Sequence, residues 1–260
     1  MKPESRGVQS IEVGGRILIA LSKFGTSLML KDIAALAELP AAQVHAYLVS
    51  FRKLELVEQD ERGSYQLGPM ALQLGLARMK SHEPLRLASS AATQLADQMG
   101  MMVTIAVWGT HGPTIVQVTE GGDQVHVNLR AGTVYSIMGT ATGKVFASYM
   151  PESLVWPYVR KEVDRVSIKD TIKTKALNAF RKEISQIKNI GYAIAMGNPI
   201  PGIHAISCPV FDHTDRMKLA VTVIGVSNKL DLQFGSKDIH TILQFTRRLS
   251  ERNGYGYSKR

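Results

Sequence analysis

The stretch LKDIAALAELPAAQVHAYLVSFRK, residues 30–53, decides the fold of the first part of the chain. Leu30–Leu39 places its apolar residues on one face of a short helix. Pro40 interrupts this helix, because proline is tolerated only in the first turn of a new one. Ala41–Leu54 then repeats apolar residues at i, i+3, i+4 and i+7, which predicts a second helix with one buried face. The residues of that face are Val44, Tyr47, Leu48 and Phe51.

The flanking segments complete a small domain. Val8–Phe24 before the stretch also has helical periodicity. After it, the short strands Leu56–Gln59 and Ser64–Leu67 flank the turn Asp60–Gly63, which predicts a β-hairpin. Three helices followed by a hairpin are typical of a winged helix-turn-helix, in which the third helix enters the major groove of DNA and the hairpin contacts phosphates.

The sequence changes character near residue 80, where helices begin to alternate with β-rich runs. We expect helices over Leu72–Lys80, Glu83–Met99, Thr140–Tyr149, Thr174–Asn189 and Gly235–Asn253. We expect strands over Val103–Trp108, Thr114–Thr119, Val125–Leu129, Ile203–Phe211 and Leu219–Ser227. The predicted class is α+β, with a winged helix-turn-helix over 1–70, a linker helix over 71–83 and a domain with a mainly antiparallel sheet over 84–260.

Composition excludes several classes of protein. Hydrophobic residues make up 45% of the 260 residues, which excludes wholesale disorder. No apolar stretch approaches the roughly 20 residues that span a bilayer. Met1–Gly7 has no apolar segment behind a basic one, so we expect no secretory signal. Cys208 is the one cysteine, which fits a reducing compartment, and we expect a cytoplasmic protein.

The formal net charge of +9 raises the expectation of a polyanionic partner, but its distribution is uneven. Residues 1–82 carry a net charge of +2, residues 83–160 of −1 and residues 161–260 of +8. We interpret the basic surplus over Lys161–Lys188 and in the C-terminal tail as solvated helix faces, with an auxiliary DNA or partner contact as the alternative.

No group of residues satisfies the requirements of catalysis. Gly139–Lys144 has the wrong spacing for a phosphate loop, and Val145 stands where Ser or Thr would hold magnesium. The candidate metal ligands His204, Cys208, Asp212 and His213 lack a zinc spacing. We therefore expect no enzyme, no catalytic residue, no metal and no cofactor, although an enzyme on a related scaffold is a rival that the sequence disfavours.

At the level of motifs, nearly the whole chain resembles the IclR family of bacterial transcription regulators. LKDIAALAELPAAQVHAYLVSFRKLELVE (30–58) and GSYQLGP (63–69) stand where the family has its recognition helix and the end of its wing. RAG (130–132), GTATGK (139–144), IGYA (190–193) and ISCPVFD (206–212) are similar to signatures of the family's GAF-like effector-binding domain. The resemblance implies a double-stranded operator DNA partner, a small organic effector and a homodimer or tetramer. From the short apolar stretches we also expect no membrane partner.

The recognition helix departs from the family pattern. Ala41-Ala42-Gln43 replaces polar or basic residues after the proline, and Ala46 replaces an arginine, so the common arginine contact with guanine is missing. We expect Gln43 to read adenine, His45 to donate one hydrogen bond and the methyl groups of Ala42 and Ala46 to meet thymine. Packing of the helix start is the alternative for the alanines. Phosphate contacts are expected from Lys31, Arg52, Lys53 and Arg62.

The resemblance places the effector pocket between Gly139–Gly143 and Ala195–Ser207. Ala195 stands where some family members have an acidic residue, so we expect a largely apolar pocket, and backbone N–H groups at the Thr140 helix to bind a ligand carboxylate. The expected pocket residues are Tyr135, Met138, Gly139, Thr140, Ala141, Ala195, Ile203, Ala205 and Ser207. Core packing is the alternative for Met138, Ile203 and Ala205.

These features predict a DNA-binding transcriptional regulator whose operator binding is modulated by an effector, expected to be an aromatic or hydrophobic monoacid. The rival from another class is a small-molecule sensor with degenerate DNA reading that acts through protein contacts. The alanine-rich recognition helix motivates that rival.

Overall fold

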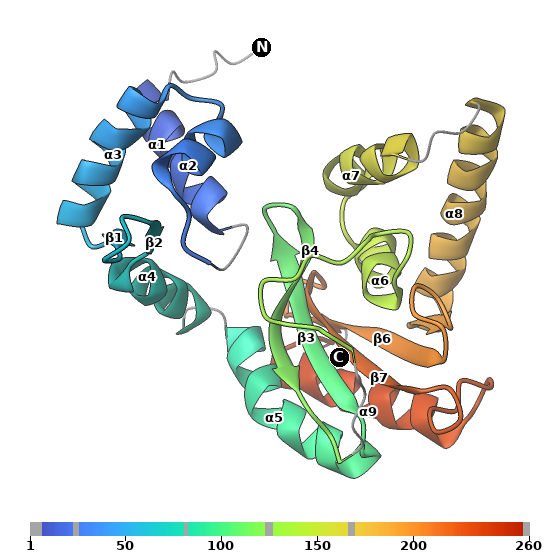
Figure 1. The fold of residues 1–260 in the computed structure, drawn as a ribbon. Coiled ribbons are helices and arrows are strands. Elements are labelled where there is room, and N and C mark those ends of the chain that lie inside the picture. The colour runs from blue at the N-terminus through green and yellow to red at the C-terminus, as the bar shows by residue number, and fades with distance from the viewer. Residues whose placement is uncertain (1–6, 23–25, 81–82, 123–126, 166–169, 257–260) are drawn as a thin grey trace. The chain divides into compact units, whose positions relative to one another are not determined.

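The computed structural model describes residues 7–22, 26–80, 83–122, 127–165 and 170–256. The chain divides into two compact units, Met1–Ser81 and His82–Arg260, which we call the N-terminal and C-terminal units (Figure 1).

The N-terminal unit is a winged helix-turn-helix, as predicted. Its elements are α1 (Gln9–Ser22), α2 (Leu30–Ala37), α3 (Ala41–Lys53), β1 (Val57–Gln59), β2 (Tyr65–Leu67) and α4 (Pro69–Lys80), and β1 pairs with β2 in an antiparallel hairpin (Figure 1). Val44 and Leu48 of α3 are fully buried, and Tyr47 and Phe51 pack against the same core. The predicted apolar stripe is therefore the buried face of α3.

A side chain of α1 holds the turn between α2 and α3. α2 ends at Ala37, and its C-cap residue Glu38 has the left-handed φ of 53°. The guanidinium of Arg16 in α1 donates hydrogen bonds to the carbonyl oxygens of Ala37 and Glu38. These bonds satisfy carbonyl groups that lack partners at a helix end, and they set the direction in which α3 leaves the turn.

The C-terminal unit is built on one antiparallel sheet of five strands in the order β4-β3-β7-β6-β5. The strands are β3 (Met102–Gly109), β4 (Gly112–Thr119), β5 (Ala193–Met196), β6 (Ile203–Phe211) and β7 (Met217–Val226). Helices α5 (Glu83–Met99) and α9 (Lys237–Arg252) cover one face, and α6 (Ala141–Tyr149) covers the other, with α7 (Glu152–Arg165) and α8 (Asp170–Ile190) packed against it (Figure 1).

Two apolar cores lie on the two faces of this sheet. Successive side chains of a strand point to opposite faces, so β6 contributes to both. Ile206, Cys208 and Val210 belong to the core under α5 and α9. Ala205 packs instead with the cluster around α6. The sheet therefore holds a second, smaller interior on its α6 side.

Three expectations from the sequence need correction. Val127–Leu129 is not a strand, because the Leu129 N–H donates to the Val127 carbonyl at 2.9 Å and turns the backbone; the rest of that expected strand lies outside the described residues. Helix α7 occupies a segment for which we expected no element, and α8 begins at Asp170 rather than Thr174. No helix in the described part of the chain has the length and apolar character to cross a membrane.

Candidate functional site

A cavity of about 240 Å³ lies on the α6 side of the sheet. Its walls come from the start of α6, the strands β6 and β7, the loop before α6 and the loop between β5 and β6. The lining residues are Val127, Leu129, Val134, Tyr135, Ser136, Thr140, Ala141, Thr142, Ala195, Asn198, Pro199, Ile200, Ile203, Ala205, Thr222 and Ile224. None of these residues carries a charge, so the described part of the wall is apolar with neutral polar groups.

Hydroxyl groups form a connected set at the floor of this cavity. The Thr142 and Thr222 hydroxyls lie 2.8 Å apart, and the Thr222 hydroxyl donates to the Ser207 hydroxyl at 2.9 Å. The Tyr135 hydroxyl lies 3.2 Å from that of Thr104. Thr104, Thr222 and Ser207 are directly paired neighbours on β3, β7 and β6, which explains why residues distant in sequence meet here.

Burial raises the pKa of Tyr135, while hydrogen bonds with Thr104 and Thr142 oppose this effect. The phenol therefore remains neutral at physiological pH. Hydroxyl groups both donate and accept, so this floor suits a neutral polar group of a ligand.

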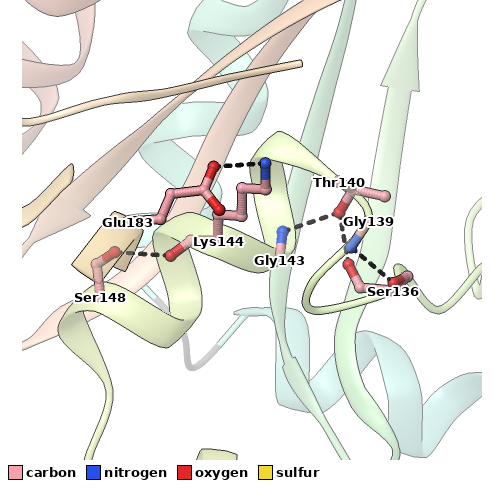
Figure 2. Close-up of polar contacts among 7 residues, drawn as sticks. All are labelled: Ser136, Gly139, Thr140, Gly143, Lys144, Ser148 and Glu183. Carbon is pink, nitrogen blue, oxygen red and sulfur yellow. Dashed lines mark hydrogen bonds and ion pairs between the residues drawn. The ribbon is translucent and has the colours of Figure 1, made fainter. Parts of the chain in front are cut away.

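The start of α6 is the polar end of the cavity wall. The Thr140 hydroxyl accepts a hydrogen bond from the Gly143 N–H at 3.0 Å and donates to the Ser136 carbonyl at 2.7 Å (Figure 2). The Lys144 N–H donates to the Thr140 carbonyl. The N–H groups of Ala141 and Thr142, the first helical residues, are then the ones without an acceptor in the helix.

Lys144 does not supply a positive charge to the cavity. Its ammonium pairs with the Glu183 carboxylate of α8 at 2.7 Å (Figure 2). The lysine of the GTATGK motif therefore ties α6 to α8.

Glu162 of α7 holds the loop that precedes α6. Its carboxylate accepts hydrogen bonds from the N–H groups of Ile137 and Met138, at 2.6 and 3.0 Å, and from the Ser136 hydroxyl at 2.9 Å. Ser136 and its neighbour Tyr135 both line the cavity. No sequence signal identified this residue, because the contact joins segments that are far apart in the chain.

The structure brings six of the nine expected pocket residues to the cavity, namely Tyr135, Thr140, Ala141, Ala195, Ile203 and Ala205. Met138 packs instead into the cluster between α6 and α7. The N–H of Gly139 donates to the Ser136 hydroxyl, and Ser207 is fully buried beneath Thr222. These three residues do not line the cavity.

The residues expected to contact DNA are all exposed on the N-terminal unit. They are Lys31, Ala42, Gln43, His45, Ala46, Arg52, Lys53 and Arg62. The Arg52 guanidinium donates to the Gln59 side-chain oxygen at 2.8 Å, which links the end of α3 to the hairpin.

Residues considered as metal ligands have other partners. Cys208 is fully buried, and burial raises the pKa of its thiol. The Asp212 carboxylate pairs with Lys218 at 2.9 Å and accepts hydrogen bonds from Thr214 and Arg216. The described residues contain no group of three or more His, Cys, Asp or Glu side chains able to hold a metal ion.

Comparison with known protein families gives two matches. A model described as the C-terminal domain of the bacterial transcriptional regulator IclR matches residues 77–250. A model described as the IclR helix-turn-helix domain matches residues 10–61.

Known relatives match over most of their length. The chain is similar to the glycerol operon regulatory protein of Streptomyces coelicolor, with 28% identity over 87% of each chain. It is also similar to the transcriptional repressor AllR of Klebsiella pneumoniae, with 22% identity over 86% of this chain and 82% of the repressor.

Two solved structures are informative. Pseudomonas aeruginosa HmgR is 31% identical, with a TM-score of 0.61 over 96% of this chain and 99% of that one. An IclR homologue from Microbacterium hydrocarbonoxydans, complexed with 4-hydroxybenzoate, is 16% identical, with a TM-score of 0.72 over 94% of this chain and 98% of that one. The second similarity concerns the fold alone.

Proposed function

Because the chain belongs to the IclR family of transcriptional regulators, we propose that a small aromatic or hydrophobic monoacid binds the cavity beside α6 and changes the affinity for operator DNA. The observation that carries this proposal is an uncharged, largely apolar cavity with a helix start in its wall. An effector acts on DNA binding only as far as it prefers one of the protein's states.

Cavity size favours a ligand with a single ring. An apolar cavity of about 150 Å³ holds benzene, and the volume of about 240 Å³ leaves room for one or two substituents. The similar fold complexed with 4-hydroxybenzoate supports a ligand of this class.

In the proposed pose, the ligand carboxylate meets the N–H groups of Ala141 and Thr142 at the start of α6. Helix N-termini attract anions through such groups and through the helix dipole. The hydroxyl groups of Tyr135 and Thr222 also line the cavity and suit a further polar substituent of the ring, such as a phenolic hydroxyl.

Isothermal calorimetry with the full chain tests this assignment. We expect 4-hydroxybenzoate and benzoate to bind, and benzamide to bind roughly 10- to 100-fold more weakly, because benzamide has the shape of benzoate without the charge that such donors favour. Ala205→Leu should abolish binding by filling the cavity. Ala77→Leu, at an exposed residue of α4, is the control substitution. Binding of polyols or cations in place of acids would contradict the proposal.

We also propose that the exposed residues of α3 and the hairpin contact the operator, with Gln43 and His45 at base edges and Lys31, Arg52, Lys53 and Arg62 at phosphates. All of these side chains are exposed in the N-terminal unit. If the protein is instead a sensor that acts through protein contacts, we expect it not to retard operator DNA in a gel-shift assay at low salt.

We propose that the regulator acts as a homodimer or a tetramer, because two recognition helices are needed to read two half-sites. The N-terminal unit exposes apolar side chains that a second copy would cover. They are Ile11 and Ile19 of α1, 74% and 40% exposed, and Leu72, Leu74 and Leu76 of α4, 65%, 57% and 45% exposed. Exposed apolar groups in such number are typical of an interface.

Sedimentation equilibrium of the full chain tests this assembly. We expect dimers or tetramers, and we expect Leu72→Glu combined with Leu76→Glu to weaken the association at least about tenfold, since each buried leucine contributes roughly 1.5–3 kcal/mol. Gln73→Glu adds a charge to the same helix without removing apolar area and should leave association nearly unchanged. A monomer at all concentrations would contradict the proposal.

A further inference from the structure

We propose that α3 reads base pairs of the operator through thymine methyl groups, with Ala42, Ala46 and Val49 as the contacting residues. This inference rests on the proposed binding of operator DNA by α3. It assigns the specificity to apolar contacts and not to a charged side chain.

The geometry of α3 places these residues at the centre of its exposed face. Successive residues of an α-helix are rotated by about 100°. Positions 42, 46, 49 and 53 therefore form a line opposite the buried residues Val44 and Leu48. Ala42 and Ala46 are exposed, and Val49 is 41% exposed although it is apolar.

Charged side chains are confined to the C-terminal end of this helix. The sequence of α3, AAQVHAYLVSFRK, has no arginine or lysine before Arg52. Arg52 is held by Gln59 of the hairpin. The N-terminal turns of a recognition helix are the ones that reach base edges. The bidentate contact of arginine or lysine with guanine is thus absent from those turns.

Methyl-bearing side chains discriminate between bases in the major groove. Thymine presents a C5 methyl group there, whereas cytosine presents an N4 amino donor and no methyl group. Burying the thymine methyl group against a methyl group of alanine or valine stabilises the complex. Covering the cytosine amino group in the same way destabilises it, because this donor is then left without an acceptor. Gln43, towards the side of the exposed face, is suited to the adenine of the same pair.

Selection from a random duplex library with the full chain identifies the operator first. Each thymine of the enriched sequence is then replaced by deoxyuridine, which removes the C5 methyl group and keeps the pairing. We expect at least one thymine in each half-site at which this change weakens binding about fourfold, as for the loss of one buried methyl-sized group. Replacement outside the enriched positions is the control and should have no effect.

Variants of α3 assign the contact. In Ala42→Gly, Ala46→Gly or Val49→Ala, we expect the ratio of affinities for thymine and uracil duplexes to fall towards one at a single base pair. This ratio is measured within each protein, so a general loss of helix stability cancels. Ala46→Arg should create a preference for guanine near the same pair, through its bidentate contact.

The outcomes separate this inference from the function on which it rests. An enriched sequence that is indifferent to uracil at every position overturns the methyl readout and leaves operator binding intact. Uracil sensitivity that none of the three truncations changes overturns the residue assignment. Failure to enrich any sequence overturns operator binding and this inference together.

Discussion

Replacing Gly143 with alanine is expected to destabilise the C-terminal unit by about 3 kcal/mol. A Cβ atom at this position would lie 2.1 Å from the Ser136 carbonyl oxygen and 2.5 Å from the Ile137 Cα atom. Both neighbours are backbone atoms, so no side-chain rotation relieves the contact. The loop that would have to move is held by Thr140 and Glu162.

Denaturant unfolding followed by tryptophan fluorescence measures this effect. The tryptophans of the chain, Trp108 and Trp156, both lie in the C-terminal unit, so their emission reports on that unit. Gly122→Ala is the matched control, because a Cβ atom at Gly122 has nothing within 4 Å. An unfolding midpoint for Gly143→Ala equal to that of the control would show that the loop and α6 are not in such close contact.

In the GTATGK motif, Gly143 and the lysine have structural roles that do not involve binding a phosphate. The glycine permits the approach of the preceding loop to α6, and the lysine pairs with Glu183 (Figure 2). The motif thereby fixes one wall of the cavity, so its residues are needed for packing and for the shape of the ligand site at once.

The sequence predicted the N-terminal unit well because its signals are local. Apolar residues repeat within α3, and Pro40 marks where the helix begins. The C-terminal unit was less predictable. Val127 and Leu129 are apolar and alternate as in a strand, yet they line the cavity. α7 carries Pro157 in its interior, where proline usually ends a helix.

The cavity was predictable only in part for a related reason. Motif resemblance located the start of α6 and strand β6, since those segments are contiguous in sequence. The hydroxyl set depends on the register of three strands, which brings Thr104, Thr222 and Ser207 into one row. Sequence periodicity does not define the partner of a strand, so Thr222 of β7 was not expected at the site.

Replacing Glu162 with alanine is expected to destabilise the C-terminal unit by about 2–4 kcal/mol and to weaken effector binding. The substitution removes the acceptor of two backbone N–H groups and one hydroxyl, and a partly buried donor without an acceptor costs about 1–3 kcal/mol. The released loop carries Tyr135 and Ser136, so the cavity wall loses its fixed position. Tryptophan-monitored unfolding and calorimetry with benzoate measure the two effects.

Asp164→Ala is the matched control on the same helix. Asp164 pairs with Lys173 at 2.8 Å, but its side chain is 67% exposed, and exposed pairs contribute about 0–1 kcal/mol. A further readout separates a loop clamp from a general loss of stability: hydrogen exchange at the Ile137 and Met138 amides should accelerate in Glu162→Ala under native conditions and stay unchanged in Asp164→Ala. If Glu162 holds this loop, the loop opens locally without global unfolding once the carboxylate is removed. Equal exchange in both variants would therefore mean that Glu162 does not hold the cavity wall.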